Sequence, residues 1–140
     1  MVVYLDTSSL VKLYVREEDS PKVADLVRAS KAAATSLIAY TEARAAFARR
    51  FREKAFTSGE YEQLVSALNR DWDNYLIVRV TRKLVRIAGE LAEKHGLRAF
   101  DAIHLSSALT LRQEVSTTVI FSSSDRRLQK ASKLEDLTQL

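Results

Sequence analysis

Short apolar segments rich in β-branched residues alternate with amphipathic helical segments along the chain. The apolar segments cover residues 2–5, 32–36, 75–80 and 117–121. The first is continuously apolar, which is typical of a parallel strand covered on both faces. Strands that alternate with helices form a parallel sheet with helices on both of its faces. The sequence therefore predicts an α/β fold.

Helix caps and helix breakers mark the segments between these strands. We expect helices over about 8–17, 20–30, 38–55, 81–95 and 100–112, with others beginning near 58 and 126. Ser20 and Pro21 are predicted as an N-cap and the first helical residue, and Ser58 as the cap of a later helix. Gly96 suits a left-handed residue that ends a helix. Residues 135–140 are expected to form either an edge strand or a frayed tail.

Composition limits the chemistry that the chain can use. It has 140 residues, long enough for one domain with its own core, and no cysteine, which excludes disulfides and thiolate metal sites. No signal-peptide pattern and no apolar run of roughly 20 residues is present, so a cytoplasmic protein without membrane contact is the default expectation. The net charge of +4 mildly favours polyanionic partners such as RNA or DNA.

Four carboxylates lie at positions that are unusual for surface acids. Asp6 directly follows the first predicted strand, and Asp125 follows the last one across three serines. In open α/β sheets, ligands bind beyond the carboxyl ends of the strands. Glu42 and Asp101 lie in line with the apolar faces of their predicted helices, where carboxylates are uncommon. These four acids are the candidate site.

Each acid also has a purely structural interpretation. Asp6 and Asp125 can cap helices, Asp101 can be a first-turn acid, and Glu42 can pair with Arg49 or a neighbouring helix.

If the acids do converge, two carboxylates about 5 Å apart repel by roughly 3 kcal/mol at an effective dielectric constant of about 20. They would then have raised pKa values or require a cation, and oxygen ligands favour Mg²⁺ or Mn²⁺. Ser8 is placed to hydrogen-bond a carboxylate or a metal-bound water.

Basic side chains accompany these acids. Arg44 and Arg49 follow Glu42, and Arg126 and Arg127 follow Asp125. They are candidates for RNA binding, although each can equally belong to a solvated helix face. Without the four acids the formal charge rises from +4 to +8. An anionic pocket in a basic body suits a metal-dependent nuclease.

Four segments in this order and at these separations resemble the PIN-domain family, and more narrowly the VapC toxins, the ribonuclease halves of VapBC toxin–antitoxin pairs. The segments are YLDTSSLVKLY, TSLIAYTEARAAFARR, FDAIHLSSAL and FSSSDRRLQKAS. The resemblance implies that residues 1–140 form a single PIN domain. It implies a three-layer α/β/α sandwich with a central, mainly parallel sheet of four or five strands, and a pocket that uses one or two Mg²⁺ or Mn²⁺ ions to cut RNA.

By position, the resemblance implies specific roles for several residues. Asp6, Glu42, Asp101 and Asp125 match the catalytic, metal-binding acids of the family, and Ser8 matches a hydroxyl beside the first acid. His104 falls where many relatives carry a histidine, and packing beside the pocket is its simpler interpretation.

The resemblance also implies partners. They are RNA, a VapB antitoxin whose C-terminal segment wraps the toxin, and a second copy of the chain that packs against the helices around 38–68.

Three alternative functions stay open. One is a non-catalytic RNA- or protein-binding module in which the acids are caps, and another is a PIN nuclease of RNA processing that is not a toxin. The third, a phosphoacceptor domain built on Asp6, is disfavoured because Ser8 stands where a second acid is usual.

Overall fold

The centre of the molecule is a sheet of four parallel strands in the order β3-β2-β1-β4. In the computed structural model, which describes residues 1–140, the strands are β1 (Val2–Leu5), β2 (Ala32–Ser36), β3 (Leu76–Val78) and β4 (Val119–Ser122). Strand β1 lies between two neighbours, with Val3 opposite Ala33 on one side and Ile120 on the other. This position explains why β1 is continuously apolar, and it confirms the α/β fold.

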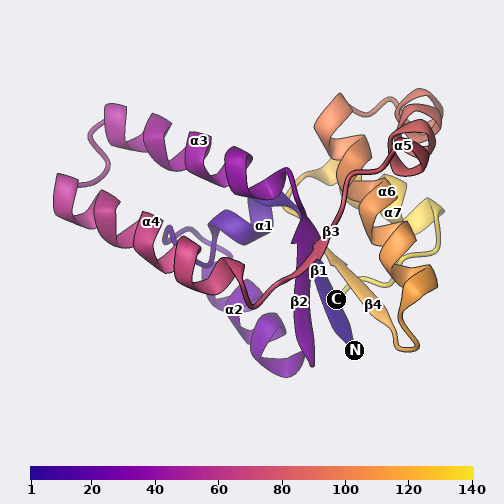
Figure 1. The fold of residues 1–140 in the computed structure, drawn as a ribbon, viewed down its shortest axis with the longest axis horizontal. Coiled ribbons are helices and arrows are strands. Elements are labelled where there is room, and N and C mark those ends of the chain that lie inside the picture. Colours follow the sequence, from indigo (N-terminus) through magenta and orange to yellow (C-terminus); the bar gives the residue numbers. More distant parts are fainter.

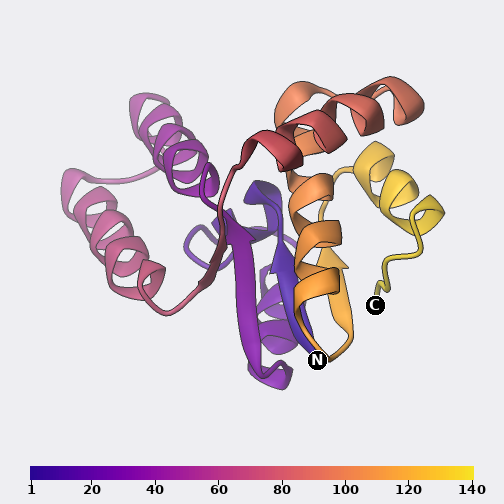
Figure 2. The same cartoon turned by 45° about the vertical axis from the view of Figure 1, so that its right-hand side comes forward.

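Seven helices cover the two faces of the sheet (Figures 1 and 2). They are α1 (Thr7–Val11), α2 (Ser20–Ala29), α3 (Ala39–Arg52), α4 (Ser58–Trp72), α5 (Arg82–His95), α6 (Ala99–Glu114) and α7 (Arg126–Leu134). Alternate side chains of β1 point to opposite faces. Val3 and Leu5 pack into the core with α1–α4, whereas Val2 and Tyr4 pack into the core with α5–α7. The three-layer sandwich is therefore confirmed.

The order of the strands creates a switch point between β1 and β4. The chain proceeds from β1 outward to β2 and β3, and then crosses back to place β4 on the other side of β1. At such a point the connections leave neighbouring strands in opposite directions and open a crevice at the carboxyl edge. The segments that follow β1 and β4 meet there, and Asp6 N–H donates to the carbonyl oxygen of Ser122 over 3.1 Å.

Two predicted helix starts are wrong by one residue. Helix α4 is capped by Thr57 rather than Ser58, because Thr57 and Glu60 form a reciprocal capping box. Helix α2 has Asp19 at its N-cap position, and Ser20 instead accepts from Glu17 N–H and donates to the carbonyl of Val15. In α4 the neighbouring hydroxyl takes over the capping bond, whereas in α2 the predicted cap uses its own hydroxyl in the preceding loop.

Other boundaries differ modestly from the expected ones. Helix α1 ends at Val11, well before residue 17, and β3 is shorter than predicted. Thr81 caps α5, and Gly96 ends it in the left-handed conformation, as expected. The C-terminal segment makes a single parallel bridge between Thr138 and Ile120 of β4 rather than a full strand. None of the seven helices combines the length and apolar character needed to cross a membrane.

Candidate active site

Asp6 is a buried carboxylate at the carboxyl end of β1, with only 3% of its surface exposed. Its Oδ1 accepts hydrogen bonds from Ser9 N–H (2.9 Å) and from the Ser8 hydroxyl (2.6 Å). Its Oδ2 accepts from the Ser123 hydroxyl over 2.5 Å. Asp6 is thus the N-cap of α1 and at the same time a carboxylate held by the loop after β4. The expected hydrogen bond from Ser8 to a site carboxylate is present.

The two serines also connect Asp6 to the loop after β4. The hydroxyl of Ser8 accepts from Ser124 N–H, and that of Ser123 accepts from Asp125 N–H, each over 3.0 Å. Asp125 in turn caps α7 by accepting from Leu128 N–H over 2.8 Å. Each serine hydroxyl donates to one carboxylate and accepts from the β4 loop, so the segments that carry Asp6 and Asp125 are held in register.

Glu42, in the first turn of α3, has partners on two other elements. Its Oε1 accepts from the Thr7 hydroxyl over 2.5 Å and lies 2.9 Å from His104 Nε2 on α6. The expected alternative of a pair with a neighbouring helix is therefore observed, with His104 rather than Arg49 as the partner. Burial raises the pKa of Glu42, but the hydrogen bonds from His104 and Thr7 more than offset this effect and hold the pKa below its usual value. Glu42 is consequently ionised at neutral pH.

His104 connects Glu42 to the core and is itself only 2% exposed. A carboxylate accepts hydrogen bonds only, so the proton of a neutral imidazole belongs on Nε2, facing Glu42. Nδ1 then accepts from the buried hydroxyl of Tyr4 over 2.8 Å. Burial, together with the charges of Asp6 and Glu42, raises the pKa of Tyr4 well above its usual value, so this donor keeps its proton. His104 thus orients Glu42, a contact that goes beyond simple packing.

Asp101, in the first turn of α6, shares an arginine with Asp125. Arg98 Nε lies 3.3 Å from Asp101 Oδ2, and Arg98 Nη2 lies 3.7 Å from Asp125 Oδ2. Burial raises the pKa of Asp101, Arg98 lowers it, and the charges of Asp125 and Asp6 raise it further, so that the net shift is upward. The charges of Asp6 and Asp125 therefore reach Asp101, although the three residues come from separate segments.

Arg98 is a site residue that the sequence interpretation missed. Its side chain is 81% exposed and lies over the two acids. Its place three residues before Asp101, one helical turn away, was the available signal. Together with Asp101, Asp125, Arg126 and Arg127 it lines a cavity of about 400 Å³ without any apolar side chain.

The predicted basic residues divide into two groups. Arg126 and Arg127 line this cavity, and Arg127 also donates to the carbonyl of Gly96 over 3.1 Å. Arg44 instead donates to the Tyr40 hydroxyl over 2.8 Å, and Arg49 is an exposed residue of α3. Neither Arg44 nor Arg49 contributes to the cavity wall.

The oxygen donors fit a hard divalent cation that keeps most of its water. No three acidic or histidine side chains approach closely enough to hold a metal ion directly. Mg²⁺ and related ions often bind through one or two carboxylates plus several waters. Burial first, and then the charges of Asp125 and Asp6, raise the pKa of Asp101 and disfavour its carboxylate form, which an added cation would stabilise. The chemistry of the site therefore matches Mg²⁺ or Mn²⁺, with part of the contacts made through water.

The Asp101→Asn variant is expected to be more stable than the wild type at pH 8 in the absence of metal. A carboxyl whose pKa is raised on folding favours the folded state only while it is protonated, and this contribution is lost as the pH rises through the folded pKa. Asparagine removes the charged form. We expect Tm to rise by about 2–4 °C, the effect of roughly 1 kcal/mol in a chain of this size.

Thermal unfolding at several pH values checks this expectation. The gain should shrink at acidic pH, where Asp101 is protonated in both states. Asp25→Asn is the matched control, because Asp25 also pairs with an arginine one turn away but on an exposed helix face. An Asp101→Asn variant that is no more stable at pH 8 than at pH 4, relative to wild type, would contradict the electrostatic picture.

The fold and the site together define the class of the protein: a parallel α/β sandwich with an acidic site at its switch point. The chain belongs to the PIN-domain family, whose model matches residues 3–134. Ribonuclease VapC45 of Mycobacterium tuberculosis (strain CDC 1551 / Oshkosh) is 35% identical over 131 residues, which cover 91% of this chain and 86% of the relative. Ribonuclease VapC46 of strain ATCC 25618 / H37Rv is 30% identical, with 94% and 90% covered.

Solved structures share the fold over nearly the whole chain. FitAcB from Neisseria gonorrhoeae has a TM-score of 0.68 at 15% identity, covering 99% of this chain and 96% of that one. VapBC2 from Rickettsia felis, bound to a DNA fragment from its promoter, has a TM-score of 0.65 at 18% identity, with 100% and 98% covered. At these identities the likeness concerns the fold.

Proposed function

We propose that the protein is a metal-dependent endoribonuclease and the toxin of a type II VapBC pair. The observation that carries this proposal is the carboxylate cluster at the switch point, in which Asp101 and Asp125 share Arg98 and the two serines that hold Asp6 also bind the loop that carries Asp125. Membership of the PIN-domain family and relatives named ribonucleases support the same reaction.

Asp6, Asp101, Asp125 and Glu42 are the residues that would hold Mg²⁺ or Mn²⁺, as one or two ions. When bound, such an ion polarises the scissile phosphate, lowers the pKa of the attacking water and stabilises the leaving oxygen. The chain supplies positioning. Ser8 and Ser123 fix both oxygens of Asp6, and the hydrogen bonds of Thr7 and His104 keep Glu42 ionised.

Basic side chains at the rim bring the substrate to these acids. Arg98, Arg126 and Arg127 line the same cavity as Asp101 and Asp125, so phosphate groups of RNA are attracted to the point where the acids lie. Hydrolysis should leave a 5′-phosphate and a 3′-hydroxyl, which the resemblance to the family implies.

The proposed partners are a VapB antitoxin and a second copy of the chain. Solved relatives include toxin–antitoxin complexes from Klebsiella pneumoniae and, as VapBC-1, from nontypeable Haemophilus influenzae. An antitoxin would inhibit by presenting basic side chains to the carboxylates of Asp6, Asp101 and Asp125. For the homodimer we propose the surface of α3 and α4, where exposed Phe51 stacks on Tyr61 with ring centroids 4.7 Å apart.

Removing divalent cations is expected to abolish RNA cleavage. Purified protein is incubated with a structured RNA in Mg²⁺ or Mn²⁺, and in EDTA, and the ends of the fragments are determined. We expect cleavage with either ion, none in EDTA, and recovery when the ion is added back in excess. Cleavage that continues in EDTA would contradict the metal dependence. Absence of cleavage under all conditions would instead favour a non-catalytic binding module.

A further inference from the structure

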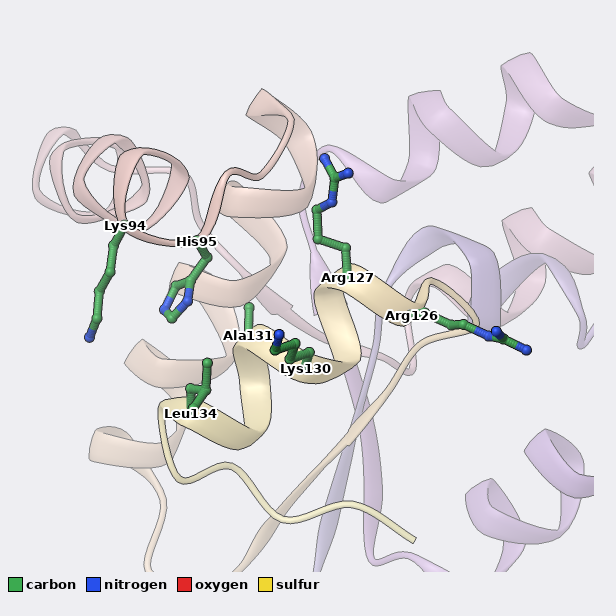
Figure 3. A pocket seen from close by; sticks show the side chains of 7 residues that line it. All are labelled: Lys94, His95, Arg126, Arg127, Lys130, Ala131 and Leu134. Atoms are coloured by element: carbon green, nitrogen blue, oxygen red, sulfur yellow. The ribbon is translucent and has the colours of Figure 1, made fainter.

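A second cavity, of about 500 Å³, opens between the end of α5 and the outer face of α7 (Figure 3). It is lined by Lys94, His95, Arg126, Arg127, Lys130, Ala131 and Leu134. Every ionisable residue in this lining is basic. The nearby carboxylate of Glu135 lies 2.7 Å from both Lys94 Nζ and His95 Nε2. It offsets the positive charge of Lys94, whereas Lys130 and the two arginines have no acidic partner inside the cavity.

The helical spacing of α7 produces this arrangement. Arg126, Lys130 and Leu134 recur every four residues and so lie along one face of the helix. Lys94 and His95 reach the cavity from the last turn of α5 (Figure 3). The left-handed Gly96 ends α5 there, and its carbonyl accepts a hydrogen bond from Arg127 of α7.

The cavity adjoins the candidate active site. Arg126 and Arg127 line both this cavity and the one that contains Asp101 and Asp125. Arg126 extends away from the Lys94 side, toward the N-terminal end of α7 (Figure 3). A cationic path thus runs from the acidic cluster along α7 to Lys94. A polyanion that binds across the acids would contact these basic side chains with the part that extends beyond the acids.

One apolar side chain narrows the choice of ligand. Leu134 lines the cavity and is 61% exposed, so it places an apolar surface beside these cations. An inorganic phosphate or a sugar phosphate has no surface that would cover it, whereas a nucleotide combines a charged phosphate with the apolar face of a base. The combination of unpaired cations and one exposed leucine therefore fits nucleic acid.

We propose that this cavity binds a nucleotide of the RNA next to the cleaved phosphodiester, with its phosphate on Lys130 and its base or ribose against Leu134. The inference rests on the proposed ribonuclease function, and it adds a substrate-binding site outside the acidic cluster. Lys94 and Arg126 border this nucleotide on its two sides.

The test compares two lysines of the same helix. In the full chain carrying Asp6→Asn, which prevents cleavage, Lys130→Gln is compared with Lys133→Gln, because Lys133 is exposed on α7 but outside the cavity. Binding of a fluorescent single-stranded RNA is measured by anisotropy at several salt concentrations. We expect Lys130→Gln to raise Kd about 5- to 10-fold and to lower the salt slope by about 1, as for the loss of one phosphate contact. Lys133→Gln should change neither.

A further variant tests the contact with the base or ribose separately from the contact with the phosphate. Leu134→Ala is expected to raise Kd about 3-fold with an unchanged salt slope, because it removes an apolar contact rather than an ionic one. The proposal is overturned if Lys130→Gln and Lys133→Gln bind RNA equally well, or if Lys130→Gln weakens only the binding of an antitoxin peptide. The ribonuclease proposal has its own readout, metal-dependent cleavage by the wild type, so the two can fail separately.

Discussion

Asp6→Asn is expected to reduce RNA cleavage by at least about 1,000-fold, the effect of losing roughly 4 kcal/mol of stabilisation of the transition state. The carboxylate charge is lost, and the amide nitrogen can no longer accept a hydrogen bond as Asp6 Oδ2 does from Ser123. The fold should persist, because asparagine caps helices as well as aspartate does and can still accept from Ser9 N–H.

Single-turnover cleavage of a defined RNA in Mn²⁺ measures this effect, with circular dichroism to verify the fold. Asp25→Asn is the control, since it removes an exposed carboxylate of α2 that pairs only with Arg28. It should cleave at the wild-type rate. An Asp6→Asn variant that retains more than a tenth of the wild-type rate would remove Asp6 from the active site and leave it as a helix cap.

His104→Leu is expected to lower the free energy of unfolding by about 3 kcal/mol. Leucine fills most of the space, but it leaves the buried hydroxyl of Tyr4 unpaired and removes one of the two hydrogen bonds that Oε1 of Glu42 accepts. An unpaired buried group costs roughly 1–3 kcal/mol, and a hydrogen bond to a charged group contributes about 1.5–3 kcal/mol. The pKa of Glu42 should also rise, because hydrogen bonding to His104 is the largest contribution that lowers it.

Denaturant unfolding of the wild type and three variants isolates this contribution. Tyr4→Phe alone leaves Nδ1 of His104 without its partner. In the double variant of Tyr4→Phe and His104→Leu, neither unpaired group of the Tyr4–His104 contact remains. The double variant should therefore be less destabilised than the sum of the single ones by about 1 kcal/mol. Strict additivity, or a loss below 1 kcal/mol for His104→Leu, would show that the hydrogen bonds of His104 contribute little.

The acids combine two roles that looked like alternatives in the sequence. Asp6 and Asp125 do cap α1 and α7, and they also belong to the electrostatic cluster around Asp101. A cap fixes a carboxylate through one oxygen, which leaves the other oxygen for another contact. For Asp6 the second oxygen binds Ser123, and for Asp125 it faces Arg98. Capping is thus a means of positioning these acids rather than an explanation that competes with the site.

Several partners at the site could not be identified from the sequence. Thr7, Tyr4 and Ser123 contact residues that lie 35, 100 and 117 positions away. A hydroxyl can donate or accept in many settings, so its sequence context does not select one partner. Arg98 is different, because its spacing from Asp101 is local, but its second contact, to Asp125, depends on how α7 packs beside α6.

The sequence by itself determined the parallel α/β architecture, most helix limits and the four acids, because apolar periodicity, caps and breakers act over a few residues. Only the tertiary structure decided which partners these acids have. It assigned Glu42 to His104, Asp101 and Asp125 to Arg98, and the basic face of α7 to a cavity next to the acids. These contacts depend on β4 lying beside β1 across the switch point, and that adjacency results from packing both faces of the sheet at once.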